Sequence, residues 1–200
     1  MQVIETPATP INFSPLLRQY TLEEFWALPE PEDRGHYDLI GGCLFMVPPP
    51  DPPHDDLDER MNASLLGFLL RNGKPGRVYH PRGSIYTDST YLEPDMMYVS
   101  NELAEQMGKR RTSADIVFEY VSASGAIYDR TTKADTYLAL GVRELWLIDA
   151  KTITIEVRNA TGESSTLAWE VRQYGQGQSA ESHVLKGWRV SVDELFAGLV

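Results

Sequence analysis

Residues 115–149, DIVFEYVSASGAIYDRTTKADTYLALGVRELWLID, form the stretch that decides the predicted fold. An apolar run at residues 116–118 opens it, and a second apolar run at residues 145–148 closes it. Between them, a polar turn leads into a helical pattern over residues 129–140. A strand, a helix and a second strand of this length are typical of a crossover unit, whose two strands lie parallel and side by side.

Glu119 is a charged residue at the end of an apolar run that predicts a buried strand. A buried carboxylate is costly unless it is paired with a cation or binds a metal. Two interpretations therefore stay open for Glu119. It forms a structural salt bridge, for which Lys133 is a candidate partner, or it belongs to a functional site.

Length and composition predict one globular domain. The chain has 200 residues, of which 42% are hydrophobic, and this is enough for a single hydrophobic core. We expect an extended arm over residues 1–20 and one domain over residues 21–200. The start of the chain lacks the pattern of a signal peptide, and no apolar run approaches membrane-spanning length. We therefore expect a cytoplasmic protein with no membrane partner.

The net charge and the cysteine content exclude several classes of protein. A formal net charge of −11 argues against a basic protein that coats nucleic acid non-specifically. It leaves open an enzyme that meets phosphate groups through metal ions. The single cysteine, Cys43, excludes an internal disulfide and a cysteine-based zinc site.

Cap and turn residues set several element boundaries. Thr21 and Glu24 have the spacing of a capping box, and Ser191 with Glu194 repeats it near the C-terminus. The glycines at residues 41–42 lie between two short apolar runs, which predicts a hairpin.

The predicted elements alternate between helices and strands, so the expected fold is α/β or α+β, with a mixed β-sheet flanked by helices. The expected helices cover residues 22–28, 54–71, 101–107, 129–140 and 191–199, and the expected strands cover residues 37–40, 43–47, 77–79, 84–87, 95–99, 116–119, 145–148, 152–157 and 167–174.

Three polar residues lie at the ends or faces of predicted core elements. Asp95 opens a strand, Glu119 lies in the next strand, and Lys133 lies on the helix that follows. If the strands are neighbours, two carboxylates and an ammonium converge on one pocket. Two carboxylates suit Mg²⁺, which keeps several waters and binds phosphate oxygens. A nearby lysine can stabilise charge on a phosphate in the transition state. This set is suited to phosphodiester hydrolysis.

The order of these residues resembles the Uma-two family of bacterial endonucleases, in the PD-(D/E)XK restriction-endonuclease-like superfamily. The resemblance runs from about residue 21 to about residue 157. Its motifs are Pro94-Asp95, residues 118–122, Asp129, Lys133, Tyr137 and residues 141–149, preceded by residues 21–29, residues 37–42 and the proline run that ends at His54.

The resemblance implies a role for each matching residue. It makes Asp95 and Glu119 the catalytic metal-binding carboxylates and Lys133 the catalytic lysine, with Asp38 and His54 in supporting positions. It implies Mg²⁺ or Mn²⁺ as the cofactor, DNA as the substrate and a homodimer as the assembly. The chain departs from the usual pattern at two points. The superfamily more often has its lysine at the position of Val121, and the family commonly has an acidic residue at the position of Cys43.

Two functional hypotheses follow. The first is a metal-dependent endonuclease that hydrolyses DNA phosphodiester bonds, which the ordered Asp95, Glu119 and Lys133 favour. The second is a non-catalytic binding or assembly module with the same fold, which the acidic composition and Cys43 favour. Taken alone, each site residue also has a structural interpretation. Asp95 would be a turn residue and Lys133 a solvated lysine. Structural interpretations also exist for five other residues. These are a helix start for His54 and Asp129, a bond to a nearby backbone group for Ser122, and a place in the core for Tyr137 and Trp146.

Overall fold

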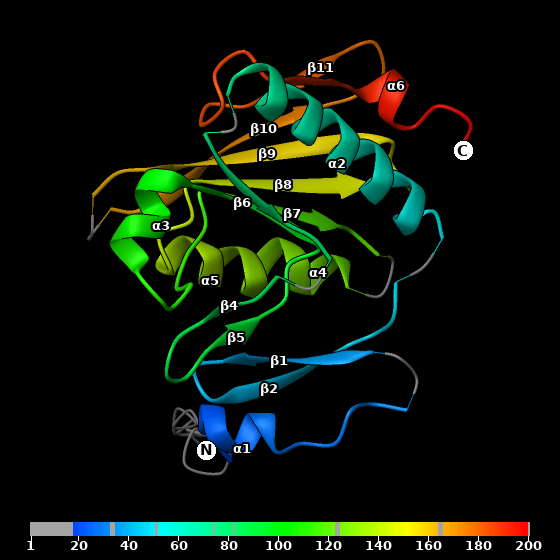
Figure 1. Ribbon diagram of the computed structural model, residues 1–200. Coiled ribbons are helices and arrows are strands. Elements are labelled where there is room, and N and C mark those ends of the chain that lie inside the picture. Colours follow the sequence, from blue (N-terminus) through cyan, green and yellow to red (C-terminus); the bar gives the residue numbers. More distant parts are fainter. Residues whose placement is uncertain are drawn as a thin grey trace, which may run out of the picture.

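The computed structural model describes residues 18–32, 35–50, 52–73, 75–81, 83–122, 125–163 and 166–199 (Figure 1). Most of the predicted arm, residues 1–17, lies outside the described residues. Among the helices that are described, none is both long enough and apolar enough to cross a membrane.

The larger sheet has six strands in the order β10-β9-β8-β7-β6-β3. β7 and β8 run parallel, and the other described pairs of this sheet run antiparallel. The crossover unit of residues 115–149 and the mixed sheet are therefore confirmed. The strands are β3 (Gly76–Tyr79), β6 (Met96–Ser100), β7 (Ile116–Tyr120), β8 (Glu144–Asp149), β9 (Thr154–Thr161) and β10 (Ala168–Tyr174).

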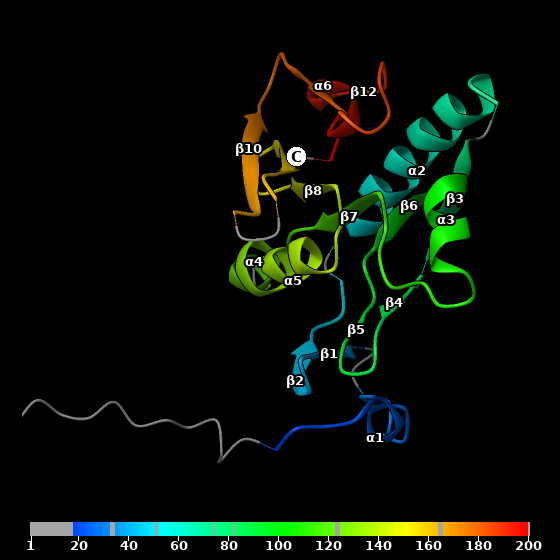
Figure 2. The ribbon, with the colours of Figure 1, turned by 90° about the vertical axis from the view of Figure 1, so that its left-hand side faces the viewer.

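Helices cover both faces of this sheet (Figures 1 and 2). On one face lies α2 (His54–Arg71), whose bounds match the predicted helix. On the other face lies a continuous helical run made of α4 (Ala126–Tyr128), a π-helical segment (Asp129–Lys133) and α5 (Ala134–Ala139). The remaining elements are α3 (Asn101–Met107), the strand pair β11 (Ser179–Glu181) with β12 (Arg189–Ser191), and α6 (Val192–Leu195).

The alternation of side chains along β7 assigns each residue to one face of the sheet. Phe118 packs in the cluster that contains Leu57 and Leu65 of α2, whereas Val117 packs in the cluster that contains Tyr137 of α5. Glu119 lies two residues after Val117, so its side chain points to the same face as Val117. The alternation along β7 therefore directs Glu119 toward the helix that carries Lys133.

A smaller sheet lies beside the larger one, in the order β2-β1-β5-β4. The hairpin of β1 (His36–Ile40) and β2 (Cys43–Val47) is confirmed, as is the capping box at the start of α1 (Leu22–Trp26). The sheet is completed by β4 (Ile85–Tyr86) and β5 (Tyr91–Leu92). Phe45 of β2 stacks on Tyr128, with ring centroids 5.1 Å apart, so this sheet packs against the start of the helical run.

Several predicted boundaries differ from the structure. The helix expected over residues 129–140 begins earlier, at Ala126, so Asp129 lies inside the helical run and does not start it. The helix expected over residues 191–199 is only α6, because residues 196–199 form turns and Gly198 has a φ of 72°. The short strands β5, β11 and β12 were not predicted, since two or three residues carry too little periodicity to be recognised.

Glu144 is a fully buried carboxylate that joins β8 to the turn before β12. One oxygen accepts a hydrogen bond from the Trp146 indole at 2.6 Å. The other accepts from the backbone N–H groups of His183 at 2.7 Å and Val184 at 3.1 Å. Each of these donors would be left unpaired without the carboxylate.

We expect Glu144→Ala to lower the free energy of unfolding by roughly 3 kcal/mol, because it leaves buried donors unsatisfied. Urea unfolding followed by circular dichroism measures this change. Glu163→Ala is a matched control, since Glu163 is exposed and should change stability by less than about 0.5 kcal/mol. Equal stability of the two variants would contradict the structural role of Glu144.

Candidate active site

A cleft of about 460 Å³ opens between the two sheets, at the C-terminal end of β7 and the first turn of α2. Of the five residues singled out from the sequence, four line this cleft: His54, Asp95, Glu119 and Lys133. The fifth, Asp38, does not line it but lies next to Lys133. The acidic and basic side chains that line this cleft include His54, Asp55, Asp58, Glu93, Asp95, Glu119, Asp129 and Lys133.

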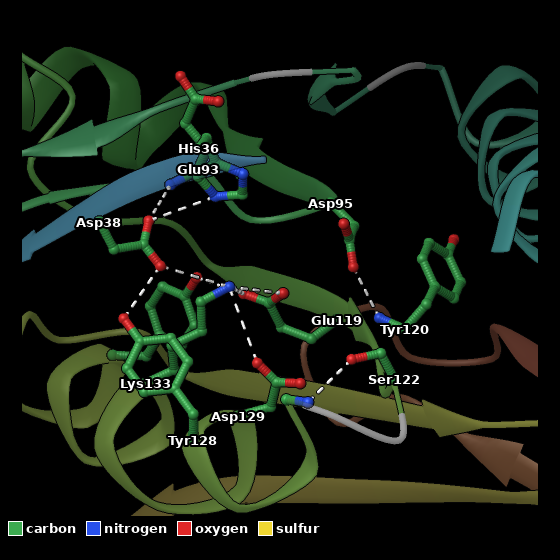
Figure 3. Close-up of polar contacts among 12 residues, drawn as sticks. His36, Asp38, Glu93, Asp95, Glu119, Tyr120, Ser122, Tyr128, Asp129 and Lys133 are labelled. Atoms are coloured by element: carbon green, nitrogen blue, oxygen red, sulfur yellow. Dashed lines mark hydrogen bonds and ion pairs between the residues drawn. The ribbon is translucent and has the colours of Figure 1, made fainter. Parts of the chain in front are cut away.

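The ammonium of Lys133 lies at the centre of the site (Figure 3). Its Nζ donates to both oxygens of Glu119, at 3.2 Å and 3.1 Å. It also lies 3.7 Å from Oδ2 of Asp38 and 3.9 Å from Oδ1 of Asp129. Lys133 is buried, so these carboxylates offset the cost of removing its charge from water.

The π-helical segment positions two of these side chains. Asp129 and Lys133 are its first and last residues and form an i, i+4 ion pair. A π-helical turn is wider than an α-helical turn, and such turns are frequent at functional sites. Tyr137 follows four residues after Lys133, and its hydroxyl donates to Oε1 of Glu119 at 2.5 Å. One side of the helical run therefore supplies three groups to the site.

Asp95 lies on the other side of the cleft. It immediately precedes β6, whose Met96 is the antiparallel partner of Phe118 in β7, so Asp95 lies opposite Glu119. Its Oδ2 accepts a hydrogen bond from the backbone N–H of Tyr120 at 2.7 Å, and its Oδ1 lies 3.0 Å from Nε2 of His54. The Asp95 side chain is 25% exposed, against 4% for Glu119, so Asp95 is the more accessible of the two carboxylates.

Asp38 brings the smaller sheet into the site. It lies in β1 with no exposed surface. Its Oδ2 accepts from the Tyr128 hydroxyl at 3.0 Å, and its Oδ1 accepts from the backbone N–H of Glu93 at 3.4 Å. The hairpin therefore contributes to the site, although this chain has Cys43 where the family commonly has an acidic residue.

The charges in the cleft shift one another's protonation. Burial alone would lower the pKa of Lys133, but Glu119, Asp38 and Asp129 outweigh it and raise that pKa well above its ordinary value. Burial alone would raise the pKa of Asp38, but the Lys133 ammonium and His36 hold it below its ordinary value. Lys133 and Asp38 are therefore a charged pair at neutral pH.

The other two acidic groups of the site shift in the opposite direction. Burial raises the pKa of Glu119 well above its ordinary value, and Lys133 opposes this shift only in part. Burial also raises the pKa of Asp129 to about 6. With Asp95, four carboxyl groups therefore lie near one ammonium. A divalent cation that binds here would displace protons from the carboxyl groups whose pKa is raised.

The donor set fits a hard divalent cation in its chemistry. Carboxylate oxygens are the protein ligands that Mg²⁺ prefers, and Mg²⁺ often takes only one or two carboxylates, with waters and phosphates completing its shell. Across the described ranges, no three His, Cys, Asp or Glu side chains are grouped closely enough to hold an ion. A metal site here would therefore depend on Asp95 and Glu119 together with oxygens that a substrate and water supply.

The structure brings Glu119 and Lys133 into contact and places Asp95 and His54 at the same cleft. The roles assigned to them stay predictions. The motif series included Asp129 and Tyr137, but sequence reasoning gave them only structural places, a helix start and the core. Tyr137 does lie in the core, and its hydroxyl also bonds Glu119, whereas Asp129 lies inside the helical run. Their spacing of four residues on either side of Lys133 is the signal that could have identified both, since such residues share a helix face.

Comparisons with known proteins agree with this fold. Residues 22–193 match the model of a family named Uma2 and described as "Putative restriction endonuclease". The chain is similar to a crystal structure from Anabaena variabilis described as "a putative nuclease belonging to DUF820", with a TM-score of 0.70 and 18% identity over 90% of this chain and 99% of that chain. At this identity the likeness shows the fold. No curated protein matches the chain significantly.

The raised pKa of Asp129 predicts a pH dependence of stability. The folded state holds the Asp129 proton more tightly than the unfolded state, whose pKa is near 3.8, so stability falls as the pH rises from 3.8 through about 6. Asp129→Asn cannot titrate and therefore lacks this loss. Between about pH 3 and about pH 7, the free energy of unfolding of the variant should rise by roughly 3 kcal/mol relative to that of the wild type. Urea unfolding across this range measures the gain, and a constant difference between the two proteins would contradict it.

Proposed function

The chain belongs to the Uma2 family, and on this premise we propose that it is a Mg²⁺- or Mn²⁺-dependent endonuclease that hydrolyses phosphodiester bonds of DNA. Membership in this family supports a nuclease function in general terms. The observation that carries the finer proposal is the buried Lys133, held by Glu119 beside a cleft that Asp95 also lines.

In this proposal Asp95 and Glu119 hold the cation. When bound, the cation supplies an activated water and neutralises charge on the phosphate. His54 orients the carboxylate of Asp95, since its ring nitrogen lies 3.0 Å from it. Tyr137 orients the carboxylate of Glu119 through its hydroxyl. These two residues are positioning residues, because each acts through a carboxylate.

Lys133 stabilises the negative charge that develops on the phosphate in the transition state. Its raised pKa keeps it protonated, so it acts as a fixed positive charge rather than as a base. The surrounding protein holds its ammonium in place before the substrate binds, and such a preorganised charge needs no rearrangement during the reaction. The net charge of −11 repels DNA, so a bound cation would help to bring the DNA backbone to the cleft.

The proposal includes three wider statements. The chain is a homodimer, because a duplex offers two strands to cut. It is cytoplasmic, since one cysteine suits a reducing compartment. Residues 21–200 act as one domain.

A non-catalytic binding or assembly module is the second candidate. One observation favours it: Lys133 engages both oxygens of Glu119, so the pair is satisfied as a buried salt bridge without any metal. The two candidates differ in whether a divalent cation binds.

We expect Mn²⁺ to raise the melting temperature of the wild-type protein by about 5 °C at a concentration near 100 times its dissociation constant. Asp95→Ala should abolish this shift because it removes a carboxylate ligand. Asp88→Ala is the control, since Asp88 is an exposed aspartate in the turn between β4 and β5. A wild-type protein that shows no shift would favour the non-catalytic module.

We expect Lys133→Ala to slow DNA cleavage by roughly 100- to 1,000-fold while the Mn²⁺-induced shift in melting temperature is retained. A protonated lysine is no metal ligand, so its removal takes away transition-state stabilisation and leaves the cation site. Glu119→Gln should weaken both cleavage and the Mn²⁺ shift. Cleavage of supercoiled and linear DNA on gels measures the rates.

Two controls make this result interpretable. Lys186→Ala removes an exposed lysine and should leave cleavage unchanged. Lys133→Met keeps the buried aliphatic stem, and its circular dichroism spectrum separates a lost charge from a lost fold. If folded Lys133→Ala cut DNA at the wild-type rate, Lys133 would be a structural residue only.

A further inference from the structure

The outer strand β10 has a free edge. It lies at the end of the larger sheet and pairs with β9 among the described residues. Figure 2 shows β10 at the outer side of the sheet, away from β8 and β7. An edge strand presents unpaired backbone N–H and C=O groups that another strand can bind.

This edge carries charged side chains but lacks the other common forms of protection. Edge strands are usually blocked by proline, by charged side chains (lysine above all), by a bulge or by short length. The sequence AWEVRQY of β10 contains neither proline nor lysine, and its register with β9 is unbroken from Ala168 to Tyr174. Val171, at its centre, is 51% exposed. The strand is therefore regular enough to pair with another strand along its length.

The charges of β10 are complementary to a second copy of β10. Glu170 and Arg172 flank Val171, and their side chains are 48% and 50% exposed. Suppose that two copies pair antiparallel about a two-fold axis through Val171, with the same face of each sheet on the same side. Glu170 of each copy then lies directly opposite Arg172 of the other, and opposite charges at facing positions attract.

The same charges disfavour the neighbouring registers. A two-fold axis through Glu170 would place this residue opposite its own copy, and an axis through Arg172 would place two guanidinium groups opposite each other. Facing like charges are destabilising. The pattern Glu-Val-Arg therefore selects the register centred on Val171.

We propose that β10 is the dimer interface of this protein, at which a second copy of the chain extends the larger sheet by antiparallel pairing centred on Val171. The interface is isologous, as in most two-fold dimers. This inference rests on the homodimer of the proposed function and names its surface. Failure of the interface can be told apart from failure of the nuclease proposal, because the assembly is measured as a mass and needs no nuclease activity.

The dimer can replace the ion pair that Glu170 and Arg172 form within a single chain. In the single chain, Arg172 donates to Oε1 of Glu170 at 2.8 Å and 3.2 Å, along the same strand. In the dimer each of these side chains can pair with its counterpart on the second copy. A single strand pair buries less surface than a standard stable interface, so we expect association in the micromolar range.

Charge reversal tests the interface and its register together. Glu170→Arg places arginine opposite arginine, and Arg172→Glu places glutamate opposite glutamate. Each variant alone should raise the dimer dissociation constant by roughly tenfold or more, because two attractive pairs become repulsive. A mixture of the two variants should dimerise, since each arginine of one chain then faces a glutamate of the other.

Sedimentation equilibrium on the full chain gives the masses, against 22.5 kDa for one chain. Asp88→Arg is the matched control, because Asp88 belongs to an exposed ion pair with Arg110 in a turn of the smaller sheet. The expected result is a dimer for the wild type and the control, monomers for each reversal variant, and a heterodimer for their mixture. Melting curves establish that both variants fold.

Three results would overturn the proposal. These are a wild-type monomer at high micromolar concentration, a Glu170→Arg variant that dimerises as tightly as the wild type, and a mixture of the two variants that stays monomeric.

Discussion

The buried ammonium of Lys133 is the interaction on which the rest of this structure depends. Removing an ammonium from water costs several kcal/mol unless partners surround it. Its partners come from three separate elements: Glu119 from β7, Asp38 from β1 and Asp129 from the π-helical segment. If one of these elements moved away, Lys133 would lose one of its three partners in the interior. One lysine therefore joins the larger sheet, the smaller sheet and the helical run between them, and the cleft forms where the three meet.

The same geometry stabilises the fold and suits the proposed chemistry. A lysine between carboxylates is a satisfied salt bridge, and in the proposal it is also a preorganised positive charge beside the cleft. Four acidic side chains, Asp38, Asp95, Glu119 and Asp129, outnumber the single ammonium, and this distinguishes the cleft from an ordinary buried ion pair. Asp95 is more exposed than Glu119 and bonds to α2 rather than to Lys133. The site therefore has an accessible carboxylate next to a locked one, an arrangement that suits a cation shared with substrate.

The larger sheet separates its tasks by position. Its central strands β7 and β8 are buried along their whole length, so they hold the core on both faces and direct Glu119 into the cleft. Its outer strand β10 is mostly exposed, so side chains such as Val171 are accessible to another surface. Strand alternation lets β7 contribute to both faces of the sheet, because each residue along a strand faces the side opposite to its neighbour's.

The sequence by itself determined the local elements and the order of the site residues. Hydrophobic periodicity identified α2 with its bounds, the hairpin of β1 and β2, and the crossover of residues 115–149, since these features depend on neighbours in the chain. The family pattern assigned roles to Asp95, Glu119 and Lys133, which stay predictions, and the structure places all three at one cleft. Only the tertiary structure decided that Asp38, in a different sheet, reaches Lys133, that Asp129 lies within a π-helical segment, and that the Tyr137 hydroxyl bonds Glu119. These facts depend on how distant segments pack, and local periodicity carries no information about that packing.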